Sequence, residues 1–248
     1  MKNYFYILLL VFVTGCGISE DCLKGNGSPT TLNFPYDNFT KIKVYSGVGL
    51  VIKEGPSYEV RIETRDNIKD NIEVSLNGDM LIVKDNSTCN IARDYGVTTV
   101  YVTAPNLEEI HCKTEQNITS DGILSFPQLK LFSIEDDGDG AGTGNFFLDV
   151  NIQDMMVETN SVTNFYLKGH CHNIHITFSW GDARFEGQDL IVTNHLSFFH
   201  RGTNDMILFP TYTFGGNLYS TGNVIIKNPP LFDPDVVQHY TGRLILDY

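Results

Sequence analysis

The most polar stretch of the chain is residues 135–140, with the sequence EDDGDG. Ca²⁺ takes about six to eight oxygen ligands, and acidic side chains spaced by glycine can wrap around it. Asp136, Asp137 and Asp139 are therefore candidate calcium ligands. The residues that follow supply no bidentate Glu of the kind that completes an EF-hand loop, and the sequence indicates no basic partner for these carboxylates. A solvated turn without a metal is the alternative interpretation.

A second group of metal-ligand types is His170, Cys171, His172 and His175. On a β-strand, His170 and His172 would share one face. A third ligand from a neighbouring segment would then complete a site for Zn²⁺ or Cu²⁺. Because exposed imidazoles on a strand mostly bind no metal, we predict no metal cofactor here.

Aromatic side chains recur just before a series of glycines in the C-terminal half. They are Trp180, Phe199, His200, Tyr219 and Tyr240. A constant spacing would place them in a row, and exposed rings in a row can stack on sugar rings or hold a protein partner. The same spacing also fits rings packed inside the corners of a fold. Phe178 and Phe198, slightly earlier in the same repeats, are assigned to the core.

The glycines themselves are part of a longer series of Gly and Asn residues that recurs every 20 to 22 positions. The series is Asn117, Gly138, Asn160, Gly181, Gly202, Gly222 and Gly242. A fixed period of this size indicates a solenoid, in which each repeat is a coil stacked on the previous one. Gly and Asn are the residues that most readily adopt positive φ, so we expect a tight corner at each position. Short β-type runs flank most of them, and alternate residues such as Ile174, Ile176 and Phe178 are expected to point inward.

The N-terminus carries a targeting signal. Lys2 precedes the apolar run 4–13, which is too short to span a bilayer as a helix, and Val13-Thr14-Gly15-Cys16 looks like a bacterial lipobox. We expect residues 1–15 to be a lipoprotein signal peptide, Cys16 to be lipidated and residues 16–31 to form a flexible tether to the membrane. This predicts a lipid-anchored protein of the outer membrane or cell surface. An ordinary signal peptide that ends near a Cys is the alternative.

Composition fits one extracytoplasmic β-domain. The chain has 17 basic and 30 acidic residues, a formal net charge of −13, which argues against nucleic acid as a partner. Val, Ile, Thr, Tyr and Phe are plentiful and no stretch keeps helical spacing, so we predict an all-β fold. Four further cysteines, Cys22, Cys89, Cys112 and Cys171, include no CxxC pair. Their pairing is open, although Cys112 and Cys171 fit buried free thiols.

Residues 32–248 are expected to form a single domain, in which a strand-rich region (32–106) precedes regular coils (107–248). The strands predicted in the first region are 41–45, 49–53, 59–63, 72–76, 80–84 and 98–103, with a hairpin turn at Asn77-Gly78.

Several motifs occur in a particular order along the chain. Phe39, Ile42 and Val44 come first, followed by GDMLIV (78–83), VTAPNLEEI (102–110), STGNVII (220–226) and a terminal TGRLIL (241–246). This order resembles the putative auto-transporter adhesin head GIN domain family. The resemblance implies a right-handed β-helix, a bacterial lipoprotein of the Bacteroidetes type and no established catalytic residues. The Ser-Gly-Ser-Gly corners expected in that family are replaced here, for example by Ser-Trp-Gly-Asp at 179–182.

Two function classes follow from these features. We expect a non-enzymatic lipoprotein whose extended β-surface binds a glycan or an envelope protein. A carbohydrate-active β-helix enzyme, a lyase or hydrolase, is the alternative and would need paired carboxylates. A purely structural role in the envelope has the same sequence features as the first class.

Overall fold

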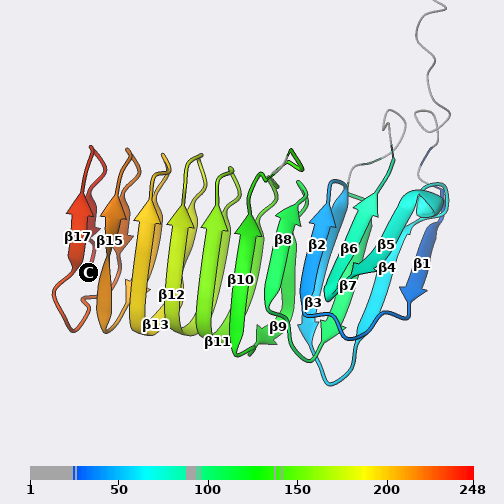
Figure 1. Ribbon diagram of the computed structural model, residues 1–248, viewed down its shortest axis with the longest axis horizontal. Coiled ribbons are helices and arrows are strands. Elements are labelled where there is room, and N and C mark those ends of the chain that lie inside the picture. Colours follow the sequence, from blue (N-terminus) through cyan, green and yellow to red (C-terminus); the bar gives the residue numbers. More distant parts are fainter. Residues whose placement is uncertain (1–24, 26, 88–93, 95, 137, 141) are drawn as a thin grey trace, which may run out of the picture.

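The computed structural model describes residues 25, 27–87, 94, 96–136, 138–140 and 142–248 (Figure 1). The all-β prediction is confirmed, because these residues form strands, one short 3-10 helix (η1, Lys69–Asn71) and no α-helix. None of the helical structure described is long and apolar enough to cross a membrane. The predicted signal peptide, Cys16 and most of the tether lie outside the described residues. The strands are β1 (Pro29–Phe34), β2 (Lys41–Tyr45), β3 (Val48–Glu54), β4 (Glu59–Arg65), β5 (Ile72–Asn77), β6 (Met80–Asp85), β7 (Thr98–Ala104), β8 (Glu109–Lys113), β9 (Ile118–Leu124), β10 (Gln128–Ser133), β11 (Phe146–Thr159), β12 (Phe165–Phe178), β13 (Phe185–His200), β14 (Met206–Pro210), β15 (Thr213–Leu218), β16 (Val224–Ile226), β17 (Asp235–Gln238) and β18 (Leu244–Leu246).

The six strands predicted between residues 41 and 103 are all present, as β2 to β7. Within the described ranges, antiparallel pairing is confined to this end of the molecule, where β4 lies between β1 and β7 and β5 forms a hairpin with β6. The hairpin turns at Gly78, whose φ of 63° lies in the left-handed region that favours glycine.

β2 and β3 also belong to a parallel stack. β2 lies beside β8, with Lys41 opposite Glu109, and β3 lies beside β9, with Leu50 opposite Ile118. On their other side β2 and β3 pair in parallel with β6 and β7. The parallel stack therefore extends across position 106, where we expected the strand-rich region (32–106) to give way to the regular coils (107–248).

From β8 onward the chain winds through successive coils (Figure 1). Each coil adds one strand segment to each of two parallel faces and lies against the coil before it. The first face contains β3, β9, the first halves of β11 to β13, β14, β16 and β18. The second face contains β2, β8, β10, the second halves of β11 to β13, β15 and β17. Residues in register are about 20 positions apart, as the sequence spacing predicts. One inward row of the first face shows this register: Phe146, Phe165, Phe185, Met206, Val224 and Leu244.

Alternate side chains of the two faces point inward and form one hydrophobic core. Phe178 and Phe198, predicted to lie in the core, are 0% and 2% exposed. Cys112 and Cys171 are buried free thiols, as predicted. Burial raises the pKa of Cys112 to about 11 and that of Cys171 to about 12, so both stay protonated thiols at neutral pH. Cys22 and Cys89 lie outside the described residues.

The glycine series marks a real corner, but for a different reason than predicted. Gly181, Gly202, Gly222 and Gly242 follow one another through the stack, linked by backbone hydrogen bonds such as Gly222 N to the Gly202 carbonyl (3.3 Å). Only Gly181 among these four has a positive φ, of 94°. At Gly222 and Gly242 a Cβ would instead fall inside van der Waals contact of a carbonyl oxygen in the preceding coil. Close approach of the backbones, rather than positive φ, therefore selects glycine at these two positions.

The earlier members of the series do not all occupy this corner. In the coil between β10 and β11 the corner position is occupied by Gly142 rather than Gly138. The Gly142 N–H donates a hydrogen bond to the Cys112 carbonyl of the preceding coil (3.1 Å). The carbonyl of Gly142 in turn accepts the hydroxyl hydrogen bonds of Ser161 and Thr163. Gly138 lies in the longer connection between β10 and β11, so this coil departs from the constant period.

Candidate functional site

The predicted calcium ligands lie in the connection between β10 and β11, and a lysine occupies the space beside them. Lys113, the last residue of β8, forms an ion pair with Asp136. Its Nζ also donates hydrogen bonds to the carbonyl oxygens of Ile134 (2.6 Å) and Gly140 (2.8 Å). The Lys113 side chain is 3% exposed. The expectation that no basic residue lies at this corner is therefore wrong, because stacking brings β8 next to it.

Asp139 is held in a similar way. Its Oδ2 accepts a hydrogen bond from the Tyr45 hydroxyl (2.8 Å) and lies 3.7 Å from Lys43 Nζ. Burial, followed by the hydrogen bond to Asp139, raises the pKa of Tyr45 to about 12. The hydrogen bond from Lys113 holds the pKa of Asp136 below its usual range. Asp137 lies outside the described residues. The ammonium groups of Lys113 and Lys43 thus neutralise the carboxylates of Asp136 and Asp139.

The histidines named above do not converge. The imidazole Nδ1 of His172 lies 3.1 Å from the Thr193 hydroxyl, and that of His175 lies 2.8 Å from the Ser197 hydroxyl. Cys171 points into the core. Over the described part of the chain, no group of three or more His, Cys, Asp or Glu side chains could hold a metal ion.

Four of the five predicted aromatic residues reach the surface. Trp180, Tyr219 and Tyr240 are 58%, 42% and 61% exposed, and Phe199 is partly buried. Tyr219 contacts Phe199 at a centroid distance of 5.1 Å and stacks on His239 at 4.0 Å. Among the described residues no ring contact joins Trp180 or Tyr240 to this stack. For Tyr240 the reason is the register between β15 and β17, which brings His239 rather than Tyr240 onto Tyr219.

His200 belongs to the interior instead. It is 0% exposed, its Nε2 lies 2.9 Å from the Asn204 carbonyl, and its Nδ1 accepts the N–H of Gly202. Burial lowers the pKa of His200 to about 4. The prediction that His200 belongs to an exposed aromatic row is therefore wrong. Its ring is packed inside the corner, which was the alternative interpretation.

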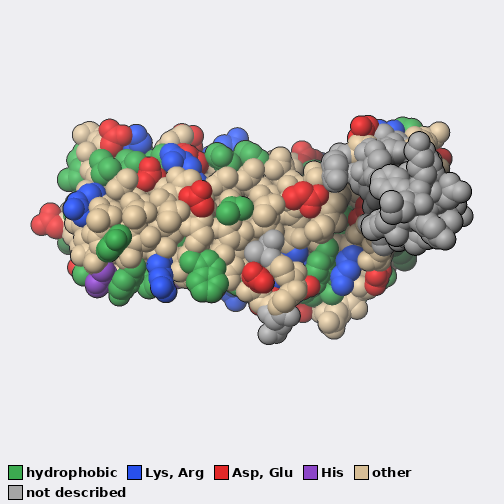
Figure 2. Space-filling view, turned by 90° about the horizontal axis from the view of Figure 1, so that it is seen from above, with side chains coloured by type: hydrophobic (Ala, Val, Ile, Leu, Met, Phe, Trp, Pro, Cys, Tyr) green, Lys and Arg blue, Asp and Glu red, His purple; other side chains and the backbone are tan. Residues whose placement is uncertain are grey.

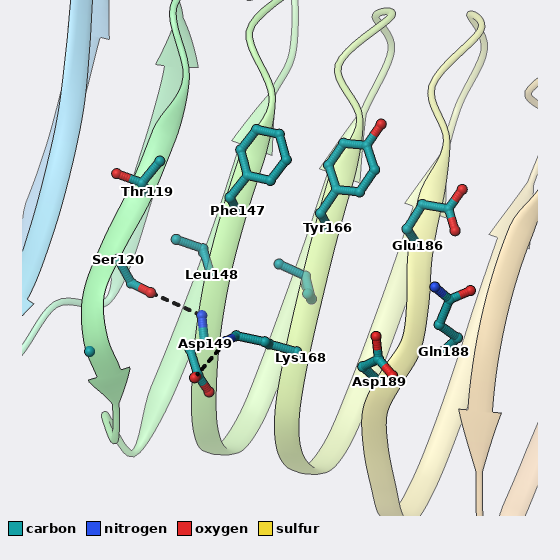
Figure 3. A pocket seen from close by; sticks show the side chains of 12 residues that line it. Thr119, Ser120, Phe147, Leu148, Asp149, Tyr166, Lys168, Glu186, Gln188 and Asp189 are labelled. Atoms are coloured by element: carbon teal, nitrogen blue, oxygen red, sulfur yellow. Dashed lines mark hydrogen bonds and ion pairs between the residues drawn. The ribbon is translucent and has the colours of Figure 1, made fainter.

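A groove on the first face exposes two rings that the sequence patterns did not indicate (Figure 3). Phe147 of β11 and Tyr166 of β12 are in register, with ring centroids 4.7 Å apart and an interplanar angle of 5°. They are 40% and 37% exposed. The groove has a volume of about 580 Å³, within the range of small-molecule sites, and extends over β9 and β11 to β13.

Local sequence explains why these two rings meet. Each follows an Asn and a buried Phe, in the motifs NFFL (145–148) and NFYL (164–167). The Asn145 side-chain oxygen accepts hydrogen bonds from the backbone and side-chain nitrogens of Asn164, at 3.2 and 3.0 Å. The buried pair Phe146 and Phe165 stacks at 5.0 Å inside the core. Alternation along the strands then places the next residue of each motif outside. The repeated motif was therefore the signal that could have indicated the groove.

Charged and polar side chains border the ring pair (Figure 3). Lys168 Nζ lies 3.2 Å from the carboxylate of Asp149, and the two occupy the next outward positions of β12 and β11. Glu186, next to Tyr166 in register, is ion-paired with Arg184. Such a combination of exposed rings with carboxylate and ammonium groups can bind a ligand that has both an apolar face and hydrogen-bonding groups.

The family model of the putative auto-transporter adhesin head GIN domain matches residues 38–230. The chain belongs to this family. No curated protein matches the chain in sequence. The matched residues of the head GIN domain include the ring pair and its charged neighbours.

Solved structures with this fold confirm the architecture. A putative adhesin from Bacteroides fragilis has a TM-score of 0.76 at 18% identity, with 90% of this chain and 99% of that chain covered. A putative adhesin from Parabacteroides merdae has a TM-score of 0.60 at 14% identity, with coverage of 90% and 98%. A protein of Parabacteroides distasonis described as a putative lipid binding protein has a TM-score of 0.62 at 11% identity, with coverage of 90% and 99%. At these identities the likeness concerns the fold alone.

Proposed function

We propose that this head GIN protein is a non-enzymatic, adhesin-type binding protein of the cell envelope, and that the groove around Phe147 and Tyr166 binds a glycan. The observation that carries the proposal is the exposed pair of parallel, face-to-face stacked rings beside charged side chains. A sugar ring has a face of C–H groups that packs on aromatic rings, and hydroxyl groups that hydrogen-bond to carboxylates and amides.

We infer the cellular setting from the N-terminal sequence and from the family. Lipidation of Cys16 would hold residues 32–248 at the outer membrane or cell surface on the tether 16–31. Parallel register about every 20 residues supports a right-handed β-helix for that single domain, since parallel crossovers are right-handed in nearly all proteins. Acidic and basic side chains are interspersed on the face shown in Figure 2, which does not favour a polyanion such as nucleic acid.

Two other functions have less support. A glycoside hydrolase needs a carboxylic acid with a raised pKa, whereas among the described residues the carboxyl groups with a displaced pKa, Glu63, Asp79, Glu109 and Asp136, are displaced downward. An acyl chain would need internal space. The core side chains at the base of the groove, Leu148 and Leu167, are at most 2% exposed and belong to the packed hydrophobic core.

A glycan array with the mature chain tests the proposal. We expect saturable binding, without change of the glycan, that is lost in the double variant Phe147→Ala/Tyr166→Ala. The matched control is Tyr212→Ala/Phe232→Ala, an exposed pair of rings 5.1 Å apart on another part of the surface. Equal loss in both double variants, or binding to no glycan, would overturn the proposal. Loss in Tyr219→Ala alone would move the site to the Tyr219–His239 stack.

A further inference from the structure

The two exposed rings form a ladder that stops after two members. Phe147 and Tyr166 each cover one face of the other. The register places Thr119 next to Phe147 on one side and Glu186 next to Tyr166 on the other. Because neither neighbour is aromatic, each ring keeps an outer face without a partner ring. Strands lie about 4.8 Å apart, so a flat ring above either neighbour would continue the ladder at stacking distance.

The two ends of the ladder differ in their hydrogen-bonding groups. Near Phe147, the hydroxyls of Thr119 and Ser120 already bond to backbone groups, the Leu50 carbonyl (3.4 Å) and the Asp149 N–H (2.9 Å). Near Tyr166, Figure 3 shows Glu186, Gln188 and Asp189 grouped at the groove. The polar groups available to a ligand are therefore on the Tyr166 side.

Glu186 is held in place before any ligand arrives. Arg184 forms an ion pair with it, and the same guanidinium donates to the Asn204 side-chain oxygen (3.2 Å) and lies 3.6 Å from the Asp205 carboxylate. The Glu186 side chain is 18% exposed. A carboxylate fixed in this way can accept hydroxyl hydrogen bonds with little loss of conformational entropy.

The charges of the groove favour a ligand without negative charge. Lys168 is paired with Asp149, and Arg184 is shared by Glu186 and Asp205. Asp189, opposite Lys168 in register, has no ion pair or hydrogen bond among the described contacts of the groove. An acidic sugar would add its carboxylate to this excess of acidic groups, at a cost from like-charge repulsion.

We propose that a neutral pyranose ring stacks on the outer face of Tyr166, above Glu186, and donates hydroxyl hydrogen bonds to Glu186 and Asp189. This assignment rests on the proposed function and specifies the ligand class and the end of the ladder that binds it. It also makes Asp189 the residue that excludes acidic glycans.

Two ring-filling variants test the location. Glu186→Phe adds a third ring to the Tyr166 end and occupies the ligand's position, so binding of neutral glycans should be lost. Thr119→Phe adds a ring at the Phe147 end and should leave binding unchanged. Tyr166→Ala should weaken binding about tenfold or more, since it removes the stacking face. Circular dichroism and the unfolding midpoint confirm folding for each variant.

A matched pair of probes tests the ligand class. Galacturonan oligosaccharides with every carboxylate methyl-esterified and the same oligosaccharides after de-esterification differ only in a neutral or an acidic C6 group, and calorimetry with both measures selectivity. We expect the esterified form to bind at least tenfold more tightly than the acidic form, and Asp189→Asn to reduce that ratio. Preference for the acidic form, or loss of binding in Thr119→Phe with retention in Glu186→Phe, would overturn this inference while leaving a glycan-binding groove. Failure of both probes and of all glycans on the array would overturn the proposed function itself.

Discussion

Lys113 and Asp136 form an ion pair although 23 residues separate them in the sequence. The lysine comes from the end of β8 and its side chain is 3% exposed, whereas the aspartate is 60% exposed. With the carbonyls of Ile134 and Gly140 as further acceptors, the ammonium group organises the connection between β10 and β11. It supplies the positive charge that the sequence suggested a calcium ion would bring.

Replacing this lysine should destabilise the protein. Lys113→Met removes hydrogen bonds from a buried charged donor to partly buried carbonyls, and we expect the free energy of unfolding to fall by about 2–3 kcal/mol. Urea unfolding followed by circular dichroism measures the change. Lys53→Met is the control, because Lys53 and Asp121 form an exposed pair at 3.3 Å whose loss should cost less than about 1 kcal/mol. Equal effects of the two substitutions would show that the Lys113 contacts are not specific.

Calcium should not stabilise the protein. An ion that binds only the folded state raises the unfolding temperature, but Lys113 and Lys43 already neutralise Asp136 and Asp139. We expect the same unfolding midpoint in excess Ca²⁺ and in EDTA, measured by differential scanning calorimetry. A midpoint that rises with Ca²⁺ concentration, and does so less in Asp136→Asn, would restore the metal site.

Buried His200 predicts a loss of stability in acid. Its pKa is lowered to about 4 in the folded state, against about 6.5 for an unperturbed histidine. The unfolded chain therefore binds more protons between these values, and stability falls as the pH drops from about 6.5 towards 4. Once the pH is below both pKa values, this pKa difference lowers the free energy of unfolding by about 3 kcal/mol. Unfolding free energies from pH 7 to pH 4 should show this slope, and His200→Gln should flatten it.

The control for this pH dependence is His195→Asn. The His195 imidazole is on the surface, with its Nδ1 2.8 Å from the Thr213 hydroxyl. This substitution should leave the slope unchanged. A slope that persists in His200→Gln would assign the acid sensitivity to other groups, such as His111, whose pKa burial also lowers.

The parts of this structure that the sequence predicted are those that depend on local patterns. Alternation in segments such as Ile174, Ile176 and Phe178 identified strands and their buried face, because side-chain direction along a strand has period two. The glycine spacing indicated the length of a coil. These features require no knowledge of which residues lie side by side in neighbouring coils.

The candidate site could not be predicted in the same way, since it depends on register between coils. Phe147 meets Tyr166, and Lys113 meets Asp136, only after the coils have stacked. Coil length varies through bulges and longer connections, as at the shift between Cys171 and Asn173 in the pairing of β12 with β13. A constant offset therefore placed Tyr240 on Tyr219, where the structure has His239.

The glycine corner gives a last prediction, which separates close approach from backbone strain. At Gly222 an added Cβ would collide with the carbonyl of Asn204 in the preceding coil, whereas at Gly78 nothing lies within 4 Å and only the φ of 63° is unfavourable. We expect Gly222→Ala to lower the free energy of unfolding by about 3 kcal/mol and Gly78→Ala by about 1 kcal/mol. Urea unfolding of the two variants measures both values. A smaller effect at Gly222 than at Gly78 would mean that the coils can move apart at this corner, and that close stacking does not require glycine at Gly222.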